Sequence, residues 1–268
     1  MHTQYVDVPH ARLAYDEHGE GPTVIVAHGM VRSREIDRRA SISAWDSLAD
    51  HSFRVVTYDA RAHGESTGRP VDDDYRWQQL ADDLLTLADA VSPNEPVHAV
   101  GTSMGTGTIL HALTQRPERF RSVALSAPPT AWNTRRPQGR LYASTATRAE
   151  QMTSAQFALA WMSGKPAPVF TGTAIAQPPS VAIDLVPAVF RGCALSDVPT
   201  DEALTGIDTP ALVLAWATDP AHPLSTAQRL AELLPQATSS TAHDVNAIRT
   251  WPGQAAAFFN EHPGSAQR

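Results

Sequence analysis

The chain has 268 residues, of which 42% are apolar and 18% charged, and these proportions exclude wholesale disorder. Its net charge of −7 argues against a nucleic acid as partner, because such partners need a basic surface. No apolar run reaches the roughly 18 residues of a membrane-spanning helix, and the first residues lack the basic and apolar segments of a secretory signal. The single cysteine, Cys193, cannot form an intramolecular disulfide and fits a reducing compartment, so we expect a cytoplasmic protein.

Five short apolar runs predict strands that are buried on both faces of a sheet. They are Thr23–His28, Arg54–Asp59, Val97–Thr102, Ser122–Ala127 and Ala211–Trp216. A hairpin is predicted before them, at Gln4–Asp16, and a weaker strand after them, at Gln236–Ala242.

Amphipathic stretches with apolar residues three and four positions apart alternate with these runs and predict helices. They are Tyr75–Val91, Met104–Gln115, Ser225–Leu234 and Trp251–Glu261. Strands that alternate with helices imply right-handed crossovers, so the sequence predicts an α/β fold with a mostly parallel sheet.

The stretch from Thr130 to Asp208 has no clear strand and is rich in proline, glycine, threonine and alanine. A plain loop of about eighty residues is not expected inside a compact domain. We therefore predict a helical cap at residues 130–208, inserted into a core domain of residues 1–129 and 209–268. Its helical pieces are expected near Arg148–Met162 and Ser180–Phe190, and a second layer of core helices is the alternative.

The segment Gly101–Gly105 (GTSMG) links the third predicted strand to a predicted helix. It matches the G-x-S-x-G nucleophile elbow in the required strand–turn–helix setting. A turn of this kind exposes the hydroxyl of Ser103 at a helix N-terminus, where the dipole and free N–H groups favour a developing anion. A chance glycine-rich turn is the alternative.

Together with this elbow, two further segments make the chain resemble the α/β-hydrolase superfamily over nearly all its length outside the cap. His28–Met30 (HGM) is similar to the family's oxyanion turn, and Asp59–Ser66 (DARAHGES) is similar to its D-x-R-G-x-G-x-S segment. The resemblance implies a mostly parallel eight-stranded sheet flanked by helices. It also implies an oxyanion hole formed by the backbone N–H groups of Met30 and Met104.

The family's triad follows the chain order serine, acid, histidine. Asp219, after the fifth apolar run, matches the acid, although an aspartate beside a proline also caps turns. His243, after the last weak strand, matches the histidine, with Ala242 in place of the family's usual glycine. His222 is set aside, because it lies so close to Asp219 in the sequence.

In such a triad His243 takes the proton of the attacking Ser103 hydroxyl, and Asp219 orients the imidazole and stabilises its charged form. Members of the superfamily with aspartate or cysteine at the elbow cleave carbon–halogen bonds, epoxides or dienelactones, whereas a serine implies acyl transfer to water. We therefore predict a carboxylic-ester hydrolase that acts on a small ester or lactone through an acyl-enzyme. The alternatives are a C–C bond hydrolase of ring-cleavage products, a thioesterase and a non-catalytic small-ligand receptor.

Gly29, Arg32, Trp132 and Trp161 are the expected substrate contacts. The arginine-rich segment Arg32–Arg39 either holds a substrate carboxylate or is a solvated loop, and the loop is favoured. The cap's aromatic residues either line the pocket or form the cap's own core. No cofactor or metal site is predicted, because Asp72–Asp74 precedes a helix, where acidic residues are common. We expect a monomer or homodimer with no nucleic-acid or membrane partner.

Overall fold

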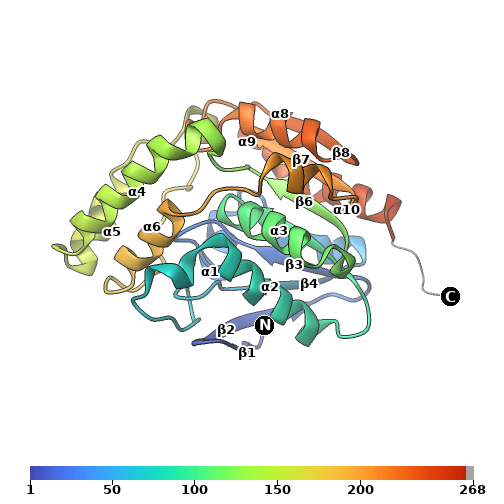
Figure 1. The fold of residues 1–268 in the computed structure, drawn as a ribbon, viewed down its shortest axis with the longest axis horizontal. Helices are drawn as coiled ribbons and strands as arrows, with labels where there is room; N and C mark the ends of the chain where they lie inside the picture. Colours follow the sequence, from blue (N-terminus) through green and yellow to red (C-terminus); the bar gives the residue numbers. More distant parts are fainter. Residues whose placement is uncertain (264–268) are drawn as a thin grey trace.

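A single eight-stranded sheet, in the order β1-β2-β4-β3-β5-β6-β7-β8, forms the centre of the computed structural model, which describes residues 1–263 (Figure 1). Its two N-terminal strands form an antiparallel hairpin that pairs with β4, and β3 to β8 are all parallel. The strands are β1 Gln4–Val8, β2 Ala11–His18, β3 Thr23–Ala27, β4 Arg54–Tyr58, β5 Val97–Thr102, β6 Phe120–Ser126, β7 Ala211–Trp216 and β8 Ala237–Ala242. The predicted α/β class is confirmed, and each predicted strand is present to within two residues at its ends.

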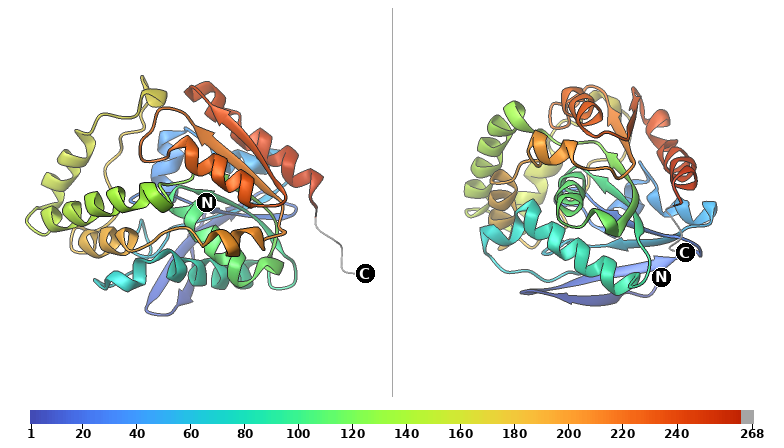
Figure 2. Two further views of the ribbon diagram at one scale, coloured as in Figure 1. Left: turned by 45° about the horizontal axis from the view of Figure 1, so that its top comes forward. Right: turned by 45° about the vertical axis from the view of Figure 1, so that its right-hand side comes forward.

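The sheet is buried on both faces, as its β-branched runs predict. In β3, Ile25 and Ala27 pack into one core cluster, and Val24 and Val26 pack into another on the opposite face. Three long helices cover the first face, and a short 3₁₀ helix and the last helix cover the second (Figure 2). These are α2 Trp77–Val91, α3 Met104–Gln115 and α8 Leu224–Leu233, then η1 Trp45–His51 and α10 Trp251–Glu261.

Residues 130–208 contribute no strand to this sheet and are mainly helical. Their elements are η4 Trp132–Thr134, α4 Arg135–Ala149, α5 Ser154–Met162, η5 Pro168–Phe170, α6 Val186–Ala194 and α7 Asp201–Thr205. Helices α4, α5 and α6 gather at one end of the molecule (Figure 1). Phe157 and Phe190 pack with Val31 of the loop after β3 in a small separate core, so these helices contact that loop.

The helices differ from the sequence prediction in three places. The predicted piece Ser180–Phe190 is helix α6, which begins only at Val186 and runs to Ala194. The predicted piece Arg148–Met162 covers the last two residues of α4 and the whole of α5. Between them the chain breaks before α5, where the side chains of Thr153 and Gln156 form a capping box. The predicted loop Arg32–Arg39 is mostly helix α1 (Arg34–Ala40), which begins where the side chain of Ser33 accepts the N–H of Ile36. The remaining short elements are η2 Asp72–Tyr75, η3 Pro117–Arg119 and α9 Val245–Arg249. Across residues 1–263, no helix has both the length and the apolar character that a membrane crossing needs.

Candidate active site

Ser103 lies in the sharp turn between β5 and α3, with φ at 55° and ψ at −109°. Positive φ is costly for a residue that carries a Cβ, and the surrounding backbone has to impose it. A Cβ on Gly105 would lie 2.1 Å from the carbonyl oxygen of Ala27, and one on Gly101 would lie 2.5 Å from that of Gly105. The two glycines therefore let strand and helix approach closely enough to form the predicted elbow.

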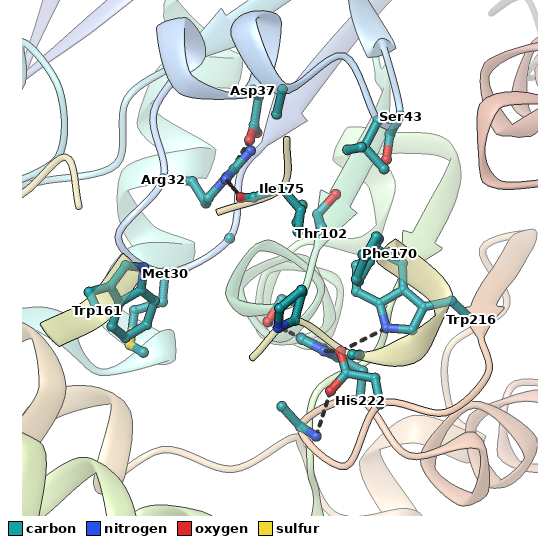
Figure 3. Close-up of a pocket in the computed structure, with 18 of the residues that line it drawn as sticks. Met30, Arg32, Asp37, Ser43, Thr102, Trp161, Phe170, Ile175, Trp216 and His222 are labelled. Atoms are coloured by element: carbon teal, nitrogen blue, oxygen red, sulfur yellow. Dashed lines mark hydrogen bonds and ion pairs between the residues drawn. The ribbon is translucent and has the colours of Figure 1, made fainter. Parts of the chain in front are cut away.

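His222 is the histidine that contacts Ser103. Its Nε2 lies 2.8 Å from Ser103 Oγ, and its Nδ1 lies 2.7 Å from Oδ2 of Asp219 (Figure 3). The ionised carboxylate can only accept, so Nδ1–H donates to Asp219 and Nε2 is left to accept the proton of the Ser103 hydroxyl. Hydroxyl, imidazole and carboxylate thus form one continuous hydrogen-bonded chain.

The predicted role of His243 is wrong in this structure. His243 follows β8 as an exposed residue, beside the start of α9, and makes no side-chain hydrogen bond within residues 1–263. His222 reaches the site because the loop turns back on itself: the N–H of Ala221 donates to Oδ1 of Asp219, and the N–H of His222 donates to the carbonyl of Asp219. The sequence signal that was available is an aspartate and a histidine three residues apart, each followed by a proline.

Asp219 is held by three donors. Besides His222 and the N–H of Ala221, the indole Nε1–H of Trp216 donates to Oδ2 at 3.0 Å. Burial alone would raise the pKa of this carboxyl. The hydrogen bond and charge of His222, together with the hydrogen bonds from Ala221 and Trp216, outweigh the effect of burial and lower the pKa below its usual value. The carboxylate is therefore ionised at neutral pH. The sequence analysis did not single out Trp216.

The turn after β3 lies directly beside Ser103. A Cβ built on Gly29 would lie 3.6 Å from Cβ of Ser103, so the two residues are neighbours. The backbone N–H groups of Met30 and Met104 donate to no protein acceptor within the described chain. The side chain of Met104 is buried toward Cys193, whereas Met30 lines the cavity in front of Ser103.

Two buried histidines hold this turn. His28 Nδ1 donates to the carbonyl of Gly29 at 2.7 Å, and His63 Nε2 accepts the N–H of Val31 at 3.1 Å. Burial, with the neighbouring His28, lowers the pKa of His63 to about 3, so its ring is neutral and can accept at Nε2. The conformation of the turn, including the positive φ of Val31 (56°), is thus held by His28 at its first residue and by His63 from another loop.

A cavity of about 460 Å³ lies in front of Ser103 and is lined by residues of the core sheet loops and of the helical stretch 130–208. Its lining is mainly apolar: Leu141, Tyr142, Trp161 and Phe170 come from residues 130–208. Phe170 and Trp216 lie closer to His222 than Trp161 does (Figure 3). The predicted contacts Gly29, Arg32 and Trp161 line this cavity.

Trp132, the fourth predicted contact, does not line it, and that prediction is wrong. Trp132 lies in η4, where its backbone N–H donates to Asp197, and it faces a second cavity together with Asp201 and Arg229.

Of the four arginines in Arg32–Arg39, only Arg32 reaches the cavity. Arg34 is buried, with Nη1 2.7 Å from Asp16 and Nε 3.1 Å from Asp59. The segment is therefore neither wholly a binding site for a substrate carboxylate nor wholly a solvated loop, because Arg34 is buried away from both the cavity and solvent. Arg34 fastens α1 to the sheet.

Comparison with known proteins now adds to this geometry. Residues 22–142 match a family described as alpha/beta hydrolase fold. A hydrolase from Pseudomonas aeruginosa PA01 superposes with a TM-score of 0.78 at 19% identity, over 98% of each chain. The chain has the α/β-hydrolase fold. The resemblance inferred from the elbow and the oxyanion turn is thereby confirmed.

Two more proteins are similar to parts or all of this chain. The enol-lactonase from Burkholderia xenovorans LB400 has a TM-score of 0.76 at 19% identity, over 96% of this chain and all (100%) of that one. The bifunctional epoxide hydrolase 2 of Sus scrofa is 32% identical over 116 residues. That match spans 43% of this chain and about a fifth (20%) of the pig protein's length.

Proposed function

We propose that this protein is a serine hydrolase that cleaves a carboxylic ester or lactone. In this proposal Ser103 is the nucleophile, His222 the general base and acid, and Asp219 the residue that orients His222. The observation that carries it is the 2.8 Å contact between His222 Nε2 and Ser103 Oγ, with the other ring nitrogen on a partly buried carboxylate. A serine hydroxyl is a poor nucleophile until a base removes its proton, and this contact supplies that base.

The steps follow from the positions of these groups. Nε2 of His222 takes the Ser103 proton as Oγ attacks the carbonyl carbon, and the carbonyl oxygen becomes an oxyanion. The N–H groups of Met30 and Met104, which have no protein acceptor, are the donors proposed for that oxyanion. One such donor contributes roughly 3 kcal/mol in comparable enzymes. The imidazolium then protonates the leaving oxygen, and water, deprotonated by His222, hydrolyses the acyl-enzyme.

The nucleophile and its surroundings favour acyl transfer over the other reactions of the superfamily. Epoxide opening in this superfamily uses an aspartate at the elbow, where this chain has Ser103. C–C bond hydrolysis would be favoured by a free cation facing the serine, but the guanidinium of Arg32 is engaged with Asp37. A complete hydrogen-bonded triad has no evident use in a receptor. The enol-lactonase named above, a protein that cleaves a cyclic ester, is an analogy for the same class.

The test is hydrolysis of p-nitrophenyl esters from acetate to decanoate, and of simple lactones, by the wild type and Ser103→Ala. Ser43→Ala is a matched control, because Ser43 lines the same cavity but is hydrogen-bonded to no catalytic group. We expect Ser103→Ala to lower kcat by at least about 10³-fold. The control should stay within about threefold. A wild type inactive on every ester and lactone, or an active Ser103→Ala, would overturn the proposal.

A second readout identifies the intermediate. Brief incubation with a slowly deacylating ester should add one acyl group to the intact mass of the wild type. The adduct should map to the peptide that contains Ser103 and be absent from Ser103→Ala.

A further inference from the structure

The ion pair between Arg32 and Asp37 is a charged feature of a mainly apolar cavity, separate from the Asp219–His222 pair. Arg32 is the one arginine or lysine among the described residues that line it, and its side chain is only 20% exposed. Nε of Arg32 lies 2.7 Å from Oδ1 of Asp37, and its Nη1 donates to the carbonyl of Ile175 at 3.2 Å. These contacts hold the guanidinium in one place but use only part of its hydrogen-bonding capacity.

The unused atoms belong to both partners. Within residues 1–263, Nη2 of Arg32 has no acceptor and Oδ2 of Asp37 has no donor, and neither atom is sealed from solvent. A guanidinium carries five N–H donors. The guanidinium of Arg32 therefore has donors left over for an acceptor on a molecule that enters the cavity. The site therefore offers donors and an acceptor to a bound molecule.

The position of the pair relates it to the reacting bond. A Cβ on Gly29 would lie 3.6 Å from Cβ of Ser103 and 3.7 Å from Cγ of Arg32, so Gly29 alone separates the two side chains. The guanidinium extends from there toward Asp37, away from His222 (Figure 3). A group that binds it therefore belongs to a substrate atom several bonds from the scissile carbonyl.

The charges of Arg32 and Asp37 determine whether a charged or an uncharged substrate oxygen binds better to Nη2. Asp37 already neutralises the guanidinium, and a substrate carboxylate on Nη2 would lie close to the carboxylate of Asp37. Like charges at such a distance in a partly buried site are unfavourable. A ketone or amide oxygen accepts the same hydrogen bond without that repulsion.

We propose that the Arg32–Asp37 pair selects esters or lactones that carry a second, uncharged carbonyl group, held by Nη2 of Arg32. This inference rests on the proposed ester or lactone hydrolysis and names its substrate class. The pair acts on specificity and takes no part in bond cleavage.

The experiment compares three p-nitrophenyl esters of similar size: pentanoate, 4-oxopentanoate and hemisuccinate. They present a methylene, a neutral carbonyl and a carboxylate at the same place. With non-enzymatic hydrolysis subtracted, kcat/KM of the wild type should be about tenfold higher for 4-oxopentanoate than for pentanoate, as one hydrogen bond to a charged donor implies. The hemisuccinate should be the poorest of the three.

Two variants separate the partners' roles. Arg32→Met should bring the 4-oxopentanoate to pentanoate ratio to about one. Asp37→Asn leaves the guanidinium charge uncompensated and should raise the hemisuccinate to pentanoate ratio about tenfold. Arg39→Met and Glu35→Gln are controls on the same helix, since these exposed residues pair with each other outside the cavity, and they should keep the wild-type ratios.

The outcomes are distinguishable. Wild-type activity without the ketone preference, or a preference that survives Arg32→Met, overturns this inference but not the serine hydrolase. An Asp37→Asn variant that still discriminates against the hemisuccinate also overturns it, and this arm decides the matter if Arg32→Met does not fold. A wild type inactive on all three esters overturns the proposed function and this inference with it.

Discussion

Asp219 and His222 are three residues apart on the loop between β7 and α8, and their side chains are hydrogen-bonded at 2.7 Å. The proposed acid and base therefore come from one loop, in which the N–H groups of Ala221 and His222 donate to Asp219. The geometry of the pair consequently does not depend on the loop that follows the edge strand β8. The third residue, Ser103, lies in the turn between β5 and α3, on the other side of the contact.

Asp219→Asn tests the orienting role of the carboxylate. An amide cannot hold His222 in the same tautomer, so we expect kcat for p-nitrophenyl esters to fall by roughly 10³- to 10⁴-fold. Asp244→Asn is the control, because Asp244 is exposed, caps α9 by accepting the N–H of Ala247, and asparagine caps equally well. Equal kcat values for the two variants would contradict the assigned role.

Trp216→Phe isolates one hydrogen bond to Asp219. Phenylalanine keeps an aromatic ring beside Trp251 and Phe170 but lacks the N–H that donates to Oδ2. We expect kcat to fall about tenfold, as the loss of one hydrogen bond to a charged group implies. Trp251→Phe, which replaces the stacked indole with a smaller ring and leaves the Trp216 donor in place, should lower the melting temperature with little effect on kcat. If Trp216→Phe changed only KM, Trp216 would be a cavity wall and nothing more.

Two glycine substitutions test the packing that forms the elbow. Gly105→Ala would force a Cβ to within 2.1 Å of the Ala27 carbonyl oxygen, and we expect it to lower the free energy of unfolding by about 2–4 kcal/mol. Gly253 of α10 has open space where a Cβ would lie, so Gly253→Ala should raise that free energy by about 0.5–1 kcal/mol. Urea titrations at pH 7 measure both, and a stable Gly105→Ala would show that strand and helix need not approach so closely.

Two buried histidines should make the free energy of unfolding fall at acid pH. Burial lowers the pKa of His98 to about 3, with smaller contributions from Arg121 and His262, and the pKa of His63 is also about 3. Below the unfolded pKa of about 6.5 the unfolded chain binds protons that the folded chain does not, so the free energy of unfolding falls as pH drops toward 3.

The slope is at most about 1.4 kcal/mol per pH unit for each such histidine. His98→Gln removes one of the groups and should make the fall between pH 6 and pH 5 shallower than in the wild type. His2→Gln, at an exposed position, should leave the slope as it is. Urea titrations at pH 7, 6 and 5 compare the three proteins, and an unchanged slope in His98→Gln would mean that the His98 ring is protonated in the folded state.

The sheet and the elbow were predictable because their signals are local. Continuous β-branched runs indicate strands buried on both faces, and β5 and β7 begin and end at the predicted residues. The glycines of the elbow indicate the close contact between β5 and α3 that the structure contains.

The proposed base, His222, was not predictable in the same way. The choice of His243 followed the chain order of the superfamily, and proximity to Asp219 in the sequence argued against His222. In the structure the loop turns so that the N–H of Ala221 donates to the side chain of Asp219. This turn brings the ring of His222 to the same carboxylate, so proximity in sequence favours His222 here.

The helices of residues 130–208 and helix α1 were harder to predict, because contacts with residues far away in the sequence stabilise them. Helix α4 contains Pro137 and Gly139, which disfavour a helix in isolation. Gly139 lies against α6, where a Cβ would be 3.0 Å from the carbonyl oxygen of Ala194, so tertiary packing accounts for the glycine. The burial of Arg34 depends on two carboxylates from other parts of the chain, Asp16 in β2 and Asp59 directly after β4.

The most direct test of the proposed triad is the rate of p-nitrophenyl ester hydrolysis by His222→Ala and His243→Ala, with folding of both checked by circular dichroism. The geometry predicts that His222→Ala loses at least about 10³-fold in kcat and that His243→Ala stays within about threefold of the wild type. The reverse result, with an active His222→Ala and an inactive His243→Ala, would contradict the Ser103–His222–Asp219 triad.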